Sequence, residues 1–141
     1  MIKKTEEIAK IRQAGKILAQ VAKVVLAEAK EGTGLKSLDG LAKELIQKAG
    51  AQPAFLGYQP YGAKKPYPCS ICTSVNDVVV HGVPGNYRLK SGDVLKLDFG
   101  VALDGWYADA AWTIGIGEIT PEAGKLIKVT EKALFAGIQQ A

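Results

Sequence analysis

Cysteine, histidine and long apolar runs are scarce in this sequence of 141 residues. Two cysteines are too few for the disulfide framework of a small secreted protein. No stretch approaches the roughly 18 uncharged residues of a membrane span, and the first residues hold no apolar signal core. With 48% hydrophobic and 23% charged residues, the composition is globular and excludes a disordered chain. We expect one domain, or part of one, in the reducing cytoplasm and without a membrane partner.

Positive charge gathers in the first half of the sequence. Residues 1–65 carry 12 basic and 6 acidic side chains, a net +6, whereas residues 66–141 carry 6 and 8, a net −2. A basic half can attract an anionic neighbour such as a nucleic acid or a ribosome. The alternative is a solvated helix face, because Lys16, Lys23 and Lys30 recur at helical spacing. The pattern indicates no specific nucleic-acid partner.

The spacing of apolar residues predicts two helices at the start of the chain, over 5–30 and 37–49. Ser37 is the expected N-cap of the second helix, and Gly50 suits its C-terminal end. Residues 51–69 then hold four of the six prolines and three of the five tyrosines, which predicts a long loop. A loop of this length is typical of a functional wall or lid.

The remaining sequence changes to strand periodicity and ends in a helix. Asp104-Gly105 lies between two β-like runs, which is the strongest short signal for a hairpin. Thr120-Pro121-Glu122 is a typical helix start. The expected elements are strands over 70–75, 78–80, 94–103 and 106–116, and a helix from 120 to 138.

The predicted hairpin brings two carboxylates together. With a two-residue turn at 104–105, Asp109 faces Gly100, and Asp98 is a diagonal neighbour on the same face of the sheet. Two like charges on an apolar hairpin repel each other and lose hydration, and a divalent cation relieves both costs. The alternative is that one acid faces solvent and the other caps a turn.

His81 is the single histidine, and it lies between an apolar run and Gly82. It could be a hydrogen-bond donor to a substrate, a general acid or base, a metal ligand or a structural group. Cys69 and Cys72 form a C-x-x-C pair, but a zinc ribbon needs a second pair and a redox pair normally opens a helix. We interpret both as free cysteines that line a pocket.

Two motifs resemble those of type I methionine aminopeptidases, of peptidase family M24. The first is SICTSVNDVVVHGVP at residues 70–84. The second is GDVLKLDFG at 92–100, followed by DGWYAD at 104–109. Both occur together at the family spacing, and the likeness extends over nearly the whole chain.

The resemblance implies an α+β architecture, the pita-bread (creatinase/aminopeptidase) fold, in which two pseudo-symmetric halves each form a curved antiparallel sheet backed by helices. Residues 1–141 would then be a single truncated domain: the first half and the first helix of the second. Family members hold two divalent metal ions, with Co, Mn, Fe or Zn as the candidates. They hydrolyse the peptide bond after an N-terminal methionine. The implied partners are peptides or nascent chains that begin with methionine, with the ribosome nearby.

The resemblance also implies residue roles. Asp98 matches a ligand of one metal ion, and Asp109 matches the aspartate that bridges both. His81 matches the histidine that contacts the scissile amide. The family's pocket for the methionine side chain aligns with Phe55, Tyr58, Tyr67 and Cys72.

Three of the five family metal ligands, a histidine and two glutamates, have no match here. No histidine follows His81 and no aspartate follows Asp109, and the three later glutamates lie outside a matching motif. We therefore expect an incomplete site, which leaves open whether the chain alone is an enzyme. The alternative is a non-catalytic association or peptide-binding module that homodimerises or pairs with a complementary half-chain. A coding frame that was cut short would give the same sequence.

Overall fold

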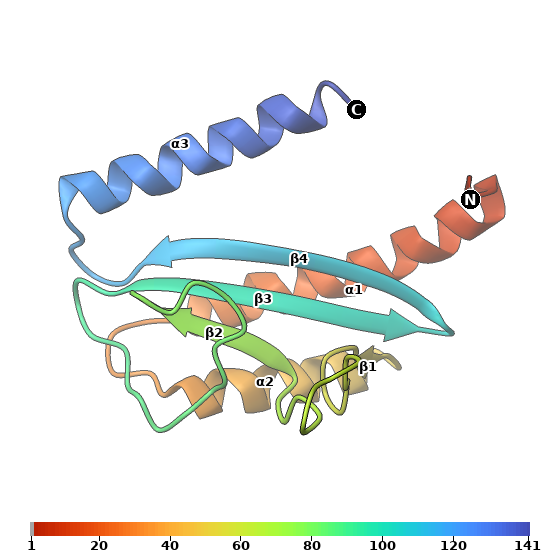
Figure 1. Cartoon of the computed structure of the whole chain (residues 1–141), viewed down its shortest axis with the longest axis horizontal. Helices are drawn as coiled ribbons and strands as arrows, with labels where there is room; N and C mark the ends of the chain where they lie inside the picture. Colours follow the sequence, from red (N-terminus) through yellow and green to blue (C-terminus); the bar gives the residue numbers. More distant parts are fainter. Residues whose placement is uncertain (1) are drawn as a thin grey trace.

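The computed structural model describes residues 2–141 and shows an α+β fold, as predicted (Figure 1). The elements in chain order are α1 (Thr5–Glu28), α2 (Leu35–Lys48), β1 (Gln52–Pro53), β2 (Ile71–Val75), β3 (Val94–Leu103), β4 (Trp106–Gly115) and α3 (Pro121–Ile138). All strand pairs are antiparallel, and β3 pairs with each of the other three strands. The long strand β3 is therefore the centre of the sheet.

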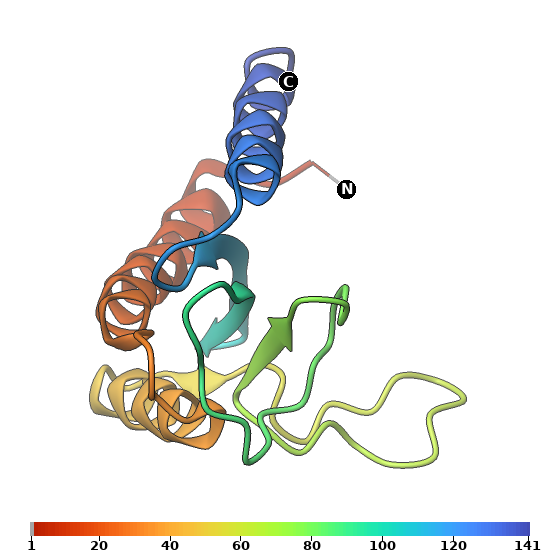
Figure 2. The ribbon, with the colours of Figure 1, turned by 90° about the vertical axis from the view of Figure 1, so that its left-hand side faces the viewer.

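The helices α1 and α2 cover one side of the sheet (Figure 2). The apolar stripe of α1 is buried against the sheet. The basic residues Lys16 and Lys23 of the same helix are exposed, which agrees with the interpretation of this charge as a solvated helix face. From β3, alternate side chains such as Leu97 and Phe99 are fully buried in the same core. Among residues 2–141, no helix combines the length and the apolar character that a membrane span needs.

The second helix begins earlier than predicted. We expected residues 37–49 with Ser37 as the N-cap, but α2 begins at Leu35 and Gly34 is its N-cap. The reason is a tertiary contact: the Leu35 amide donates to the Tyr87 carbonyl at 3.0 Å, which holds the helix start in place. Gly50 follows the end of the helix, as predicted. Its φ of 75° is a left-handed value, which glycine adopts readily at this position.

The predicted hairpin is confirmed at the level of single residue pairs. Asp104 and Gly105 adopt φ angles of 49° and 80°, the left-handed values that a type I′ turn requires. Gly100 pairs with Asp109, as the two-residue turn predicted. Side chains at even positions of β3 therefore point to the side of the sheet opposite α1 and α2.

The strand predicted over 78–80 is wrong. The chain leaves the sheet after Val75, because Asn76 takes a left-handed φ of 50° and its Oδ1 accepts a hydrogen bond from the Val94 amide at 2.9 Å. The apolar run that follows lies on a loop, and Val79 is 75% exposed. A run of valines is typical of a strand, but the turn at Asn76 decides the path here.

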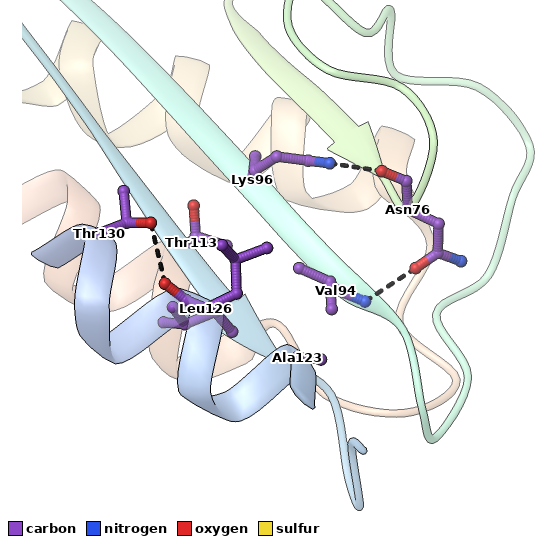
Figure 3. Close-up of a pocket in the computed structure, with 8 residues that line it drawn as sticks. Asn76, Val94, Lys96, Thr113, Ala123, Leu126 and Thr130 are labelled. Atoms are coloured by element: carbon purple, nitrogen blue, oxygen red, sulfur yellow. Dashed lines mark hydrogen bonds between the residues drawn. The ribbon is translucent and has the colours of Figure 1, made fainter. Parts of the chain in front are cut away.

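The last helix lies on the other side of the sheet and contacts it only near its start (Figure 1). The first turns of α3, with Leu126, border a cavity of about 350 Å³ whose other wall includes Val94 and Lys96 (Figure 3). Lys96 Nζ donates to the Asn76 carbonyl across this region at 2.6 Å. Every residue of α3 is partly or fully exposed, and Leu134 is 59% exposed.

Candidate active site

A cavity of about 760 Å³ lies where the loop after β1 meets the open face of the sheet. The loop predicted over 51–69 is wrong at its start, because Gln52–Pro53 pairs with β3 as the short strand β1. The seven residues predicted for the site all line this cavity: Phe55, Tyr58, Tyr67, Cys72, His81, Asp98 and Asp109. They come from the loop, from β2, from the segment after β2 and from both strands of the hairpin. The structure therefore brings together the predicted metal ligands and the predicted substrate pocket.

The strand register places both carboxylates on one face. Asp98 is paired with Ala111, and Asp109 with Gly100, so the two acids are diagonal neighbours. On the other edge of β3, Cys72 lies directly opposite Asp98. The side chains of these three residues consequently share the face that lines the cavity.

Asp98 has the electrostatic character of a cation ligand. Its Oδ1 is buried and has no hydrogen-bond partner among residues 2–141. Burial raises the pKa of this carboxyl above its usual value, and the charge of Asp109 raises it further; His81 and the Phe99 amide only partly oppose them. A divalent cation would compensate both the lost hydration and the repulsion, and carboxylate oxygens suit such an ion. The residues present therefore fit the metal that the sequence predicted.

His81 is held over the sheet by its neighbour Gly82. The Gly82 carbonyl accepts a hydrogen bond from the Thr73 amide at 2.8 Å, and the Gly82 amide donates to Ser74 Oγ at 3.0 Å. A Cβ at this position would overlap the Thr73 carbonyl oxygen, so only glycine allows this approach. His81 itself has a left-handed φ of 58°. The two hydrogen bonds of Gly82 therefore hold the neighbouring His81 imidazole at the cavity.

Tyr67 connects the loop to both β2 and the His81 segment. Its hydroxyl is placed to donate to the carbonyls of Ile71, at 3.1 Å, and Gly82, at 3.0 Å. Burial, and then the neighbouring Cys72 thiol, raise the pKa of Tyr67 well above its usual value, so the hydroxyl keeps its proton. The Tyr67 amide also donates to the Tyr58 carbonyl at 2.8 Å. The residue thus has a structural contribution besides the predicted pocket role.

Phe55 lies against the backbone of the hairpin. A Cβ at Gly100 would come within 2.5 Å of the Phe55 ring, so the glycine provides the space for that ring. Because Gly100 is opposite Asp109 and two residues from Asp98, the ring forms an apolar wall beside the carboxylates.

Two contributors with charged side chains were not predicted from the sequence. Lys65 lines the cavity from the loop, where the proline and tyrosine content indicated a wall but no particular residue. Asp39 of α2 accepts hydrogen bonds from the amides of Ser70, at 2.7 Å, and Ile71, at 3.0 Å, and so fixes the start of β2. No local pattern relates Asp39 to a strand about thirty residues away. Both cysteines are free, as predicted, but only Cys72 lines the cavity; the expectation that Cys69 also does so is wrong.

Comparison with known proteins defines the class. The sequence pattern of metallopeptidase family M24 matches residues 9–141, and the chain belongs to this family. A methionine aminopeptidase of Clostridium perfringens is 44% identical over 141 residues, which are 100% of this chain and 54% of that relative. The chain thus spans about half the length of the curated relatives it matches.

Solved structures agree with this assignment. The crystal structure of methionine aminopeptidase from Rickettsia prowazekii matches 98% of this chain and 53% of that one, at a TM-score of 0.91 and 36% identity. The enzyme from Thermotoga maritima matches 100% and 55%, at a TM-score of 0.92 and 34% identity. The predicted fold, half of a pita-bread architecture, is therefore confirmed.

Proposed function

We propose that this chain forms one wall of a metal-dependent aminopeptidase site that removes the N-terminal methionine from peptides or nascent chains. The observation that carries the proposal is the convergence of Asp98, Asp109 and His81 in one cavity with apolar walls. The 44% identity to a protein named methionine aminopeptidase supports the reaction and the substrate class.

In this proposal each residue has a defined task. Asp98 and Asp109 would hold divalent ions, with Co, Mn, Fe or Zn as candidates and two ions in a complete site. Such ions, when bound, polarise a carbonyl group and activate water for hydrolysis. His81 would donate a hydrogen bond to the amide that is cleaved, which orients the substrate.

The pocket for the methionine side chain would be formed by the loop and β2. Aromatic rings and a polarizable thioether make favourable contacts of about 0.3–1.5 kcal/mol each. The residues that would supply this surface are Phe55, Tyr58, Tyr67 and Cys72. A cytoplasmic location close to ribosomes belongs to the same proposal, and the two free thiols agree with a reducing compartment.

We further infer that turnover needs donor groups beyond those of residues 2–141. Two carboxylates supply only part of the roughly four to eight ligands that a divalent ion takes, and the resemblance implies that a histidine and two glutamates supply others. Residues 1–141 would then be the first half of the fold together with the first helix of the second half, and the isolated chain would release no methionine.

A chimera tests the proposal. Residues 1–141 replace the matching segment of the Clostridium perfringens relative, and the product is assayed with Mn²⁺ for release of methionine from a Met-Ala-Ser peptide. We expect the chimera to release methionine, whereas Asp109→Asn in the chimera lowers the rate at least about a hundredfold.

The matched control is Asp104→Asn, the same chemical change in the hairpin turn outside the cavity. Asparagine tolerates the left-handed turn conformation, so this variant should retain activity. A well-folded chimera without activity, or equal rates for both variants, would contradict the proposal.

A second candidate function is association without catalysis, by homodimerisation or by pairing with a complementary half-chain. The apolar side chains exposed on α3 favour it: Leu126, Leu134, Phe135 and Ile138 are 56–67% exposed. Light scattering on the purified chain tests self-association. A strict monomer at all concentrations, in the absence of any other chain, rejects the homodimer.

A further inference from the structure

Three donor atoms of different chemistry converge at one end of the cavity. One ligand atom each from Cys72, His81 and Asp98 lies within 4.8 Å of the other two. Cys72 and Asp98 are directly opposite each other in the β2–β3 pair, so the sheet itself fixes their separation. His81 approaches from the exposed segment that is attached to β2 through Gly82.

The distances are close to those of a zinc site. Bonds of about 2.3 Å to sulfur and about 2.0–2.2 Å to nitrogen and oxygen place tetrahedral donors roughly 3.3–3.8 Å apart. Since 4.8 Å is the upper limit of the three separations, a contraction of at most about 1–1.5 Å would bring the atoms to this spacing. Rotation of the exposed His81 side chain shortens its own two separations, and side-chain rotation of Cys72 and Asp98 adjusts the third while the paired strands stay in place.

Within residues 2–141, one of these donor residues also has an oxygen atom without a hydrogen-bond partner. Asp98 Oδ1 is buried without a hydrogen-bond partner among residues 2–141, although buried carboxylate oxygens are normally paired. The Cys72 side chain, next to it across the sheet, is only 3% exposed. A cation between them would satisfy the oxygen.

We propose that Cys72, His81 and Asp98 form a second binding site, overlapping the carboxylate pair at Asp98, for one thiophilic divalent cation such as Zn²⁺, using residues of this chain alone. The thiol proton is released to solvent when the cation binds, and the fourth coordination position is left to water. This inference does not depend on the proposed aminopeptidase function, in which Asp98 shares its ion with Asp109.

The two sites exclude each other because they share Asp98. Oxygen-preferring ions such as Mn²⁺ would select the carboxylate pair, and thiophilic ions would select the site with Cys72. A cation on Cys72 would also occupy the wall proposed for the methionine side chain. Excess thiophilic cation therefore blocks the cavity.

A titration of the whole chain with Co²⁺ tests the site, because a cobalt–thiolate bond gives a charge-transfer band in the near ultraviolet. We expect one band-forming Co²⁺ per chain. Cys72→Ser should abolish the band and weaken Co²⁺ binding at least about tenfold. The matched control, Cys69→Ser, should retain the band, since Cys69 does not line the cavity.

Two further variants keep the test decisive. His81→Ala changes an exposed side chain and should weaken formation of the band about tenfold or more without unfolding the chain. Asp109→Asn should retain the band but lose Mn²⁺ binding, which separates this site from the carboxylate pair. The proposal is overturned by absence of the band, by a band that survives Cys72→Ser, or by Co²⁺ binding unchanged in His81→Ala.

Discussion

Replacing Gly82 by alanine should detach the His81 segment from the sheet. The added Cβ would overlap the Thr73 carbonyl oxygen and lie 2.9 Å from Ser74 Cα, and both are backbone atoms of β2. Neither atom can move without disturbing the pairing of β2 with β3. The segment that carries His81 must therefore shift outward.

The cost follows from the hydrogen bonds that this shift breaks. Gly82 accepts from the Thr73 amide and the Tyr67 hydroxyl and donates to Ser74 Oγ, at distances of 2.8–3.0 Å. Each such bond contributes about 0.5–1.5 kcal/mol, so the attachment is weakened by roughly 2–4 kcal/mol. At about 1.4 kcal/mol per factor of ten, that corresponds to an opening equilibrium shifted about 30- to 1,000-fold.

Hydrogen exchange of the Thr73 amide measures this opening. We expect its exchange to accelerate about 30- to 1,000-fold in Gly82→Ala, while amides in the β3–β4 ladder keep their protection. The matched control is Gly85→Ala in the same segment, where the added Cβ comes no closer than 3.9 Å to any atom. Unchanged Thr73 exchange in Gly82→Ala would refute the reasoning.

Two other substitutions test hydrogen-bonded contacts, one just before β3 and one beside the cavity. Burial raises the pKa of Asp93, but hydrogen bonds from a backbone amide and from Asn76 and Tyr87 outweigh it and hold the pKa below its usual value. The stabilisation is therefore complete above the unfolded pKa of about 4, and is lost as the pH falls through the lower folded value. Asp93→Asn should lower the free energy of unfolding by about 1–3 kcal/mol at neutral pH and by less at about pH 3, measured by urea unfolding; an equal deficit at both pH values would contradict this. Tyr67→Phe removes the hydroxyl that meets two carbonyl groups and should lower the free energy of unfolding by about 1 kcal/mol; an unchanged midpoint would show that the hydroxyl contributes nothing.

Local signals were sufficient for the hairpin and for its two carboxylates. The Asp104-Gly105 pair determines the turn type, and the turn determines which residues face each other. The common face of Asp98 and Asp109 then follows from the alternation of side chains alone.

Features that depend on distant contacts could not be predicted in the same way. The start of α2 is fixed by the Tyr87 carbonyl, about fifty residues away, so Ser37 was the wrong cap. The valine run at 78–80 has strand composition, but the left-handed turn at Asn76 takes it off the sheet. The position of Cys72 opposite Asp98 depends on pairing across a long loop and was not predicted; the family resemblance indicated only that Cys72 belongs to the pocket.

The most direct measurement of the central claim is a double-mutant cycle of Mn²⁺ affinity for the two carboxylates. If Asp98 and Asp109 hold one ion together, Asp98→Asn and Asp109→Asn each weaken binding at least about tenfold, and the double variant loses little more than either single one. Asp104→Asn, in the hairpin turn, should bind Mn²⁺ as the unaltered chain does. Independent, additive effects, or an affinity that Asp109→Asn leaves unchanged, would show that the two side chains do not share a cation.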